Sequence, residues 1–151
     1  MSIKEEAAKM KLASPLMASA PAEKRNSALL HMIENLEAGK EKIFAANRID
    51  LAAAKASGLP PAVMKRLAFD EGKLADSISG IRQLISLPDP VGKVTLARLL
   101  DGGLRLSRVT CPIGVIAMIF EARPDAMIQI SSLAVKSGNC AILKGGKETK
   151  E

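Results

Sequence analysis

The chain has 151 residues, of which 48% are hydrophobic, a length and composition that suit one folded domain and exclude a disordered chain. Its net charge of +6 comes from 22 Lys and Arg against 16 Asp and Glu, scattered along helices. With no Trp, no Tyr and three Phe, base-stacking platforms are almost lacking. The composition therefore disfavours nucleic-acid binding and suits an enzyme that acts on anionic small molecules.

The sequence contains neither a pattern typical of a membrane span nor one typical of a secretory signal. No run of about 20 apolar residues exists, so we expect no membrane span. The N-terminal stretch "MSIKEEAAKMK" contains acids and no apolar region, so it does not resemble a secretory signal. A cytoplasmic protein is expected.

Helical patterns dominate the first part of the chain. Leu29, Ile33 and Leu36 recur on one helix face, with Lys and Glu opposite. Pro15 is expected to disturb the first helix, and Gly39 to end the second. Helices are expected over 4–19, 21–39, 40–58, 60–69 and 70–87.

Strand patterns begin after Pro90. In the stretch 93–110, apolar and polar residues alternate on both sides of Asp101-Gly102-Gly103, a pattern that predicts a β-hairpin. The run "PIGVIAMIF", 112–120, is almost wholly apolar and β-branched, as in a strand buried on both faces of a parallel sheet.

A strand–helix–strand unit follows. After the loop "EARP", Pro124 and Asp125 open a helix that extends to about Lys136, with Gly138 just past its end. "CAILK", 140–144, predicts a second buried strand, which completes a βαβ unit. Since two parallel strands need further neighbours, and the sequence stops where another helix would begin, we expect the front part of a longer protein.

Neither the cysteines nor the histidine indicate a chemical site. Cys140 lies inside an apolar run, where a thiol usually serves as a small buried hydrophobe. Cys111 has no nearby His or metal-ligand spacing, and the lone His31 lies within a helical pattern. Two reduced structural thiols are the simpler interpretation, and no metal site can be assembled.

The stretch "KGGKE" is the candidate ligand-binding loop. Loops after parallel strands lie at the carboxyl edge of the sheet, where open α/β folds bind ligands. Lys144 and Lys147 supply cations there, and Gly145 and Gly146 allow close backbone approach. The dinucleotide and phosphate-loop fingerprints are absent, so a plain solvated loop is the alternative.

Two segments carry a resemblance to a known family. "GLRLSRVTCPIGVIAMIFEARPDAM" and "KSGNCAILKGGKET" closely resemble the γ-glutamyl phosphate reductases (glutamate-5-semialdehyde dehydrogenases) of the aldehyde dehydrogenase superfamily. The similarity extends upstream through "NRIDLAAAKASGLPPAVMKRLAF" and "IRQLISLPDPVGKV", and so covers nearly the whole chain. Because members of this family are much longer, the chain matches only their N-terminal portion.

The resemblance implies a reaction. The family uses NADPH to reduce L-glutamyl 5-phosphate to L-glutamate 5-semialdehyde and phosphate in proline biosynthesis, through attack by a cysteine thiolate and a thioester. Neither Cys111 nor Cys140 matches that cysteine, which is expected downstream, so this chain alone is expected to be inactive. Two alternatives remain: a non-catalytic truncated fragment or interaction module, and another acyl-substrate dehydrogenase on the same scaffold.

The resemblance also implies cofactor contacts for the set Lys144, Gly145, Gly146 and Lys147. Lys144 corresponds to a strand-end lysine or arginine that contacts the adenine ribose. Lys147 stands where many NAD-dependent relatives have a ribose-binding glutamate. Its ammonium would attract a 2′-phosphate and so favours NADP(H), the alternative being that Lys147 simply faces water.

Arg123 is the candidate substrate-binding residue. By resemblance it lies in a loop between cofactor and substrate, where it could meet a phosphate or carboxylate through charge-assisted bonds. It could equally be a structural arginine that binds a carbonyl. Asp125 stands where the family more often has Asn. Its carboxylate adds a negative charge close to the expected position of the anionic substrate.

The predicted fold class is α/β, in three parts. Residues 1–90 form a helical N-terminal part of the cofactor domain, 91–110 a β-hairpin, and 111–151 the opening βαβ of an incomplete Rossmann-like, NADP-binding domain. The hairpin resembles the oligomerisation arm of aldehyde dehydrogenases, so we expect a homo-oligomer when the protein is complete.

Overall fold

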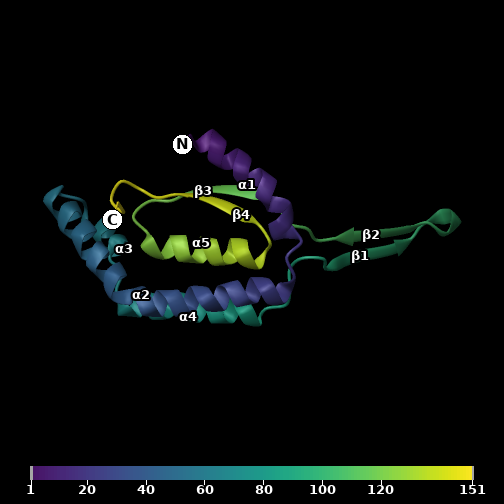
Figure 1. The fold of residues 1–151 in the computed structure, drawn as a ribbon, viewed down its shortest axis with the longest axis horizontal. Helices are drawn as coiled ribbons and strands as arrows, with labels where there is room; N and C mark the ends of the chain where they lie inside the picture. Colours follow the sequence, from purple (N-terminus) through teal and green to yellow (C-terminus); the bar gives the residue numbers. More distant parts are fainter. Residues whose placement is uncertain (1, 151) are drawn as a thin grey trace.

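The computed structural model describes residues 2–150. Within them, helices precede two separate two-stranded sheets, and only the second sheet has an α-helix between its strands (Figure 1). The order is α1 (Ile3–Ala18), α2 (Ala22–Ala56), α3 (Pro61–Leu67), α4 (Glu71–Ser86), β1 (Val94–Leu99), η1 (Asp101–Gly103), β2 (Arg105–Val109), β3 (Val115–Ile119), α5 (Pro124–Lys136) and β4 (Cys140–Lys144).

Helix α1 contains Pro15 and continues past it to Ala18. A capping box starts the helix: the Glu5 N–H donates to Ser2 Oγ at 3.3 Å, and the Ser2 N–H donates to Glu5 Oε2 at 2.9 Å. Proline cannot donate to the carbonyl four residues back, that of Lys11, but the Ser14 hydroxyl donates to it at 3.0 Å. The expected disturbance at Pro15 therefore does not end the helix.

Helix α2 is one helix of 35 residues, so the predicted stop at Gly39 is wrong. Ile43 and Phe44 continue the apolar face of Leu29 and Ile33 beyond Gly39, and all four belong to one packed core. A glycine inside a helix costs only about 1 kcal/mol, which this packing outweighs. The predicted helices over 21–39 and 40–58 are thus the two parts of α2.

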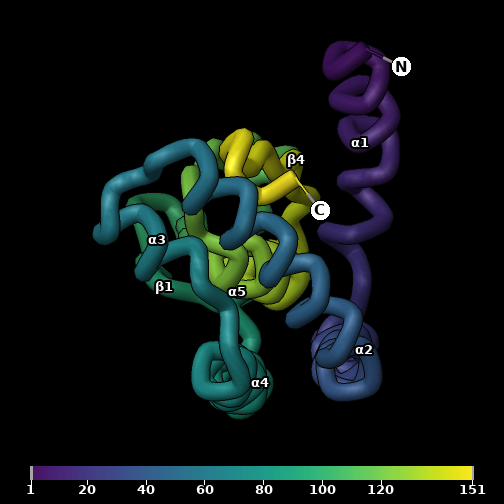
Figure 2. The backbone as a smooth tube through the Cα atoms, turned by 90° about the vertical axis from the view of Figure 1, so that its left-hand side faces the viewer, coloured from purple at the N-terminus to yellow at the C-terminus, as the bar shows by residue number. Residues whose placement is uncertain are grey.

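The core lies between α2, α4 and α5. Figures 1 and 2 show α2 and α4 side by side, with α5 against them. The Asp70 carboxylate caps α4 by accepting the Lys73 N–H at 2.9 Å, as the predicted helix start at Asp70 requires. The buried members of the core cluster are Leu29, Ile33, Phe69, Leu74, Ile81 and Ile128.

Two buried cations join these three helices at one end. Arg25 of α2 donates to the carbonyl of Lys136 at the end of α5, and to Asp89 Oδ2 at 2.7 Å. The Lys136 ammonium donates to two carbonyls at the end of α4, those of Ile85 at 3.1 Å and Leu87 at 2.8 Å. Both side chains are buried. Arg25 Nε also donates to the Ala20 carbonyl at 3.1 Å and Lys136 Nζ to Asn26 Oδ1 at 3.1 Å, so each nitrogen has an acceptor.

The predicted hairpin is confirmed as β1 and β2, which pair antiparallel and project away from the helices (Figure 1). Gly102 and Gly103 turn the chain with φ of 68° and 81°, values that glycine adopts without strain. Nearly every residue of the ribbon is exposed, including Leu99 and Leu104.

The predicted βαβ unit is also confirmed. Strands β3 and β4 pair in parallel, from Val115 opposite Cys140 to Ile119 opposite Lys144, with α5 between them in sequence. Strand β3 is shorter than the predicted 112–120, and it is not buried on both faces: Ile119 is 78% exposed and Met118 39%. The reason is that, within residues 2–150, α5 and α1 are the elements that pack on this pair, which has no third strand.

Candidate functional site

The site lies at the carboxyl edge of β3 and β4, where both predicted binding loops leave the sheet. The register places Ile119 opposite Lys144, and the Phe120 N–H donates to the Lys144 carbonyl at 3.1 Å. The loop with Arg123 and the loop from Lys144 onward therefore begin at the same level of the sheet. The sequence prediction that both loops share this edge is confirmed.

The loop that leaves β4, here called the strand-end loop (Lys144–Lys150), exposes the two predicted cofactor-binding lysines, Lys144 and Lys147. The Lys144 ammonium donates to the neighbouring Gly145 carbonyl at 3.3 Å, a long bond that leaves most of its donor capacity for other partners. An anion that reached this loop would therefore meet two accessible ammonium groups.

The two glycines of this loop are half-buried and lie close to side chains that follow them in the sequence. A Cβ on Gly145 would lie 3.0 Å from Thr149 Oγ1, and one on Gly146 would meet the Glu148 carboxylate, the far end of a flexible side chain. Neither glycine has a positive φ. The loop folds closely on itself, and Thr149 Oγ1 donates to the Gly146 carbonyl at 3.3 Å.

The neighbouring loop presents Arg123 at the start of α5. Ala122, just before it, is buried and has a φ of 47°, a left-handed conformation that a non-glycine residue rarely adopts. The Arg123 guanidinium is 57% exposed and lies 4.0 Å from Asp125 Oδ2, too far for a hydrogen bond. Arg123 is therefore a loosely paired cation beside the strand-end loop, with an acid as its near neighbour.

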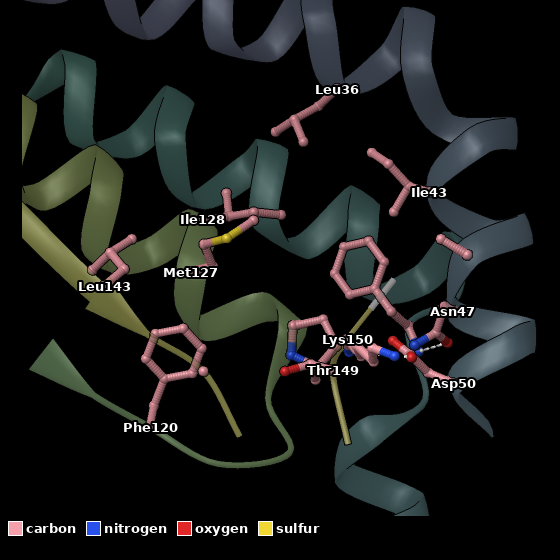
Figure 3. A pocket seen from close by; sticks show the side chains of 14 residues that line it. Leu36, Ile43, Asn47, Asp50, Phe120, Met127, Ile128, Leu143, Thr149 and Lys150 are labelled. Atoms are coloured by element: carbon pink, nitrogen blue, oxygen red, sulfur yellow. Dashed lines mark hydrogen bonds between the residues drawn. The ribbon is translucent and has the colours of Figure 1, made fainter. Parts of the chain in front are cut away.

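A cavity of about 380 Å³ lies beside these loops. Its walls are mostly apolar, with Phe120, Met127 and Leu143 on the βαβ side and Ile43 on the α2 side (Figure 3). Polar groups lie at one end of the cavity, namely Asn47 and Asp50 of α2 and Thr149 and Lys150 of the strand-end loop. The volume lies within the range of small-molecule pockets.

Sequence reasoning did not identify Asn47 and Asp50. Both are buried, and both accept a backbone N–H from a distant segment: Phe69 donates to Asn47 Oδ1 at 2.8 Å, and Lys150 to Asp50 Oδ1 at 3.2 Å. The signal available in the sequence was their spacing, because with Ile43 they fall at i, i+4 and i+7 on one helix face. Polar residues on such a face indicate specific partners.

The cysteines lie away from this edge. Cys140 opens β4 and Cys111 precedes β3, so both belong to the amino ends of the strands. Both thiols are unbridged, Cys111 exposed and Cys140 half-buried. Within residues 2–150 no group of three or more His, Cys, Asp or Glu could hold a metal ion, and no helix has the length and apolar character of a membrane span.

Comparison with curated proteins gives close relatives. Over its full length the chain is 50% identical to γ-glutamyl phosphate reductases of Pelotomaculum thermopropionicum and Acetivibrio thermocellus. In both cases it spans 35% of the relative's length. No protein-family model matches the sequence.

Solved structures agree with this result. The γ-glutamyl phosphate reductase of Saccharomyces cerevisiae matches 99% of the chain with a TM-score of 0.92 and 43% identity, and the chain covers 38% of it. That of Thermotoga maritima matches 96% with a TM-score of 0.90 and 34% identity, with 35% of it covered.

A more distant structure shows how widely the fold is shared. A putative aldehyde dehydrogenase of Bacillus subtilis matches 93% of the chain with a TM-score of 0.61 at 17% identity, which indicates a shared fold alone. The chain as a whole therefore matches the N-terminal portion of the γ-glutamyl phosphate reductases, an oxidoreductase family related in fold to the aldehyde dehydrogenases.

Proposed function

We propose that this chain forms the first part of an enzyme that uses NADPH to reduce L-glutamyl 5-phosphate to L-glutamate 5-semialdehyde and phosphate, in proline biosynthesis. The observation that carries the proposal is the match to γ-glutamyl phosphate reductases along the whole chain, at 50% identity in sequence and a TM-score of 0.92 in structure. The chain spans about a third of those relatives, so the activity belongs to the longer protein.

The cofactor-binding part of the proposal assigns Lys144, Gly145, Gly146 and Lys147 to the adenosine end of NADPH. The donor chemistry fits, because two exposed ammonium groups and a glycine pair at a carboxyl edge suit a phosphate-bearing ribose. When bound, the cofactor supplies a hydride. The preference for NADPH over NADH rests on Lys147, whose positive charge attracts the 2′-phosphate.

The substrate-binding part of the proposal assigns Arg123 to the anionic substrate. Its guanidinium is exposed and only loosely paired with Asp125, so it is available for a bidentate bond to a phosphate or carboxylate. Asp125 opposes this role electrostatically, and a neutral Asn at that position would strengthen it.

The acyl-transfer chemistry requires a nucleophile that this chain does not place at the site. A thiolate would attack the acyl phosphate and release phosphate, and the resulting thioester would accept hydride. Because both cysteines lie at the amino ends of the strands, we propose that the nucleophile belongs to the longer protein. The unbridged thiols support a reducing compartment, and we propose the cytoplasm.

We further propose that the hairpin joins copies of the longer protein. The ribbon projects from the helices and exposes Leu99, Leu104 and Val109, apolar side chains that a partner copy could cover (Figure 1). Sedimentation velocity of the longer protein tests this proposal. Deletion of 94–109 should yield monomers, and an unchanged oligomer would contradict it.

NADPH oxidation in the presence of L-glutamyl 5-phosphate, made in situ by a glutamate kinase, tests the activity. A longer protein that begins with this sequence should turn over, and the 151-residue chain alone should not. The isolated chain should also bind a hydrophobic dye, because Ile119 and Met118 are exposed. Turnover by the isolated chain, or none by the longer protein, would contradict the proposal.

A further inference from the structure

We propose that Asp50 of α2 is a positioning residue that holds the strand-end loop, Lys144–Lys150, at the carboxyl edge of the sheet. The consequence is that Asp50 sets where Lys144 and Lys147 present their charges. The identity of the ligand rests on the function proposed above, whereas the anchoring of the loop does not.

The direct contact joins residues 100 positions apart in the sequence. Asp50 Oδ1 accepts the Lys150 N–H at 3.2 Å, and Asp50 is 9% exposed. Removing a buried carboxylate from water is costly unless donors replace the water, and the Lys150 N–H is one such donor. In turn, this bond fixes the far end of the loop (Figure 3).

The near end of the loop is fixed independently. The Phe120 N–H donates to the Lys144 carbonyl at 3.1 Å, and the Phe120 ring lies 3.8 Å from where a Cβ of Gly145 would be. The loop is therefore anchored to β3 at its first residue and to α2 at its last. Lys147 lies between the two anchors, and its position depends on both.

A second side chain on the same face of α2 performs a similar task. Asn47, one turn before Asp50, accepts the Phe69 N–H at 2.8 Å and donates to the Leu67 carbonyl at 2.9 Å. It thus holds the segment between α3 and α4 against α2. The same helix face therefore secures two incoming segments through buried polar side chains.

The charge of Asp50 and its acceptor oxygen can be separated by mutation. Asp50→Asn keeps an oxygen that accepts the Lys150 N–H and removes the negative charge, whereas Asp50→Ala removes both. If anchoring is the role, Asn should substitute for Asp and Ala should not. A role that depends only on the negative charge of Asp50 would be lost in both variants.

Amide hydrogen exchange of the full 151-residue chain, without cofactor, tests the anchoring. Asp50→Ala should speed exchange of the Lys150 amide, which donates to Asp50, by about tenfold. Asp50→Asn should leave it within about twofold. The matched control is Asp101→Ala at the hairpin tip, which also removes a carboxylate that accepts a backbone N–H, from Gly102 at 2.9 Å.

A variant that leaves α2 intact covers the case in which Asp50→Ala unfolds the chain. Lys150→Pro removes the N–H donor itself, and should weaken NADPH binding by the longer protein as Asp50→Ala does, while α4 and α5 keep their amide protection. Unchanged NADPH affinity in Lys150→Pro, or unchanged exchange of the Lys150 amide in a folded Asp50→Ala, would overturn the anchoring.

Fluorescence titration with NADPH, carried out on a longer protein that begins with this sequence, then links the anchor to binding. Asp50→Ala should weaken NADPH binding by about tenfold, and Asp50→Asn and Asp101→Ala should bind like the unmodified protein. Faster loop exchange with unaltered NADPH affinity would overturn the claim that Asp50 positions the lysines. An unmodified longer protein that binds no NADPH contradicts the proposed function instead, and the exchange data still decide whether Asp50 anchors the loop.

Discussion

Arg25 and Asp89, which lie 64 residues apart in the sequence, form an ion pair with 2.7 Å between Nη2 and Oδ2. The hydrogen bond from Arg25 lowers the pKa of the Asp89 carboxyl below its ordinary value of 3.8, and the Val91 N–H adds to this effect. Arg25 also donates to the Lys136 carbonyl, so one buried guanidinium joins α2, the end of α5 and the segment that leads to the hairpin.

Stability should therefore depend on pH through Asp89. A carboxyl with a lowered folded-state pKa stabilises the fold fully above pH 3.8, and this contribution is lost as the pH falls through the folded-state pKa. Asp89→Asn should lower the free energy of unfolding at pH 7, and its difference from the unmodified chain should narrow below pH 3.8. Urea unfolding at several pH values measures this.

The control for this experiment is Asp76→Asn, an exposed aspartate on α4. It should change the unfolding free energy little at any of these pH values, since surface charges contribute little. The ion pair would not have this role if the difference in unfolding free energy between Asp89→Asn and the unmodified chain stayed constant down to pH 2.

Gly138 should not tolerate a side chain. Its φ is 70°, and a Cβ there would lie 3.0 Å from Pro112 Cγ and 3.5 Å from the Met17 carbonyl oxygen. Gly138→Ala should lower the free energy of unfolding by about 2 kcal/mol or more, from the left-handed backbone and the close contact together. Chemical denaturation measures the change.

Gly39 provides the matched comparison, because the same substitution should have the opposite sign. It lies inside α2, has no positive φ, and a Cβ there would meet no atom within 4 Å. Gly39→Ala should raise stability by about 0.5–1 kcal/mol, since alanine favours the helix. Equal losses at both glycines would mean that the local geometry at Gly138 is not the cause.

Lys147 should determine the choice between NADPH and NADH. In a longer protein that contains this segment, Lys147→Glu should weaken NADPH binding by roughly ten- to a hundredfold while NADH binding changes little. Isothermal titration with each cofactor measures the two affinities. Lys24→Glu, the same change near the start of α2, is the control, and equal losses for both cofactors would contradict the assignment.

The two cysteines should be dispensable for chemistry. Cys111→Ser and Cys140→Ala in the longer protein should keep turnover, because neither thiol lies at the carboxyl edge. Cys140→Ala should cost about 1 kcal/mol of stability, as Cys140 is half-buried at the start of β4. Steady-state kinetics decide the matter: a folded Cys111→Ser protein without turnover would identify Cys111 as the nucleophile.

The features that sequence reasoning predicted are mostly local. The hairpin around Asp101, the helix that opens at Pro124 and the strand "CAILK" each have a short signal, either a turn residue, a cap or an apolar run. Parallel pairing of the two strands then placed Arg123 and Lys144 at one edge, because the carboxyl ends of parallel strands share an edge.

The errors and omissions arise from contacts between distant segments. Gly39 has the local signal of a helix end, but packing of the residues on either side of it against α4 and α5 keeps α2 continuous. The bond from Lys150 to Asp50 spans 100 residues, and no pattern within α2 indicates which segment supplies the donor. The apolar sequence of β3 predicted a fully buried strand because such a composition fits a larger sheet than residues 2–150 contain.

The length of α2 has a consequence for the order of folding. Arg25 and Asp50 are separated by about 37 Å of helix, and they bind segments at opposite edges of the β3–β4 pair. A helix forms through local contacts within about a microsecond, whereas parallel strands must first close a long connection. We expect α2 to form early and to present both anchor residues before β4 docks. In pulse-labelling experiments, amide protection should therefore appear in α2 before it appears in Cys140–Lys144.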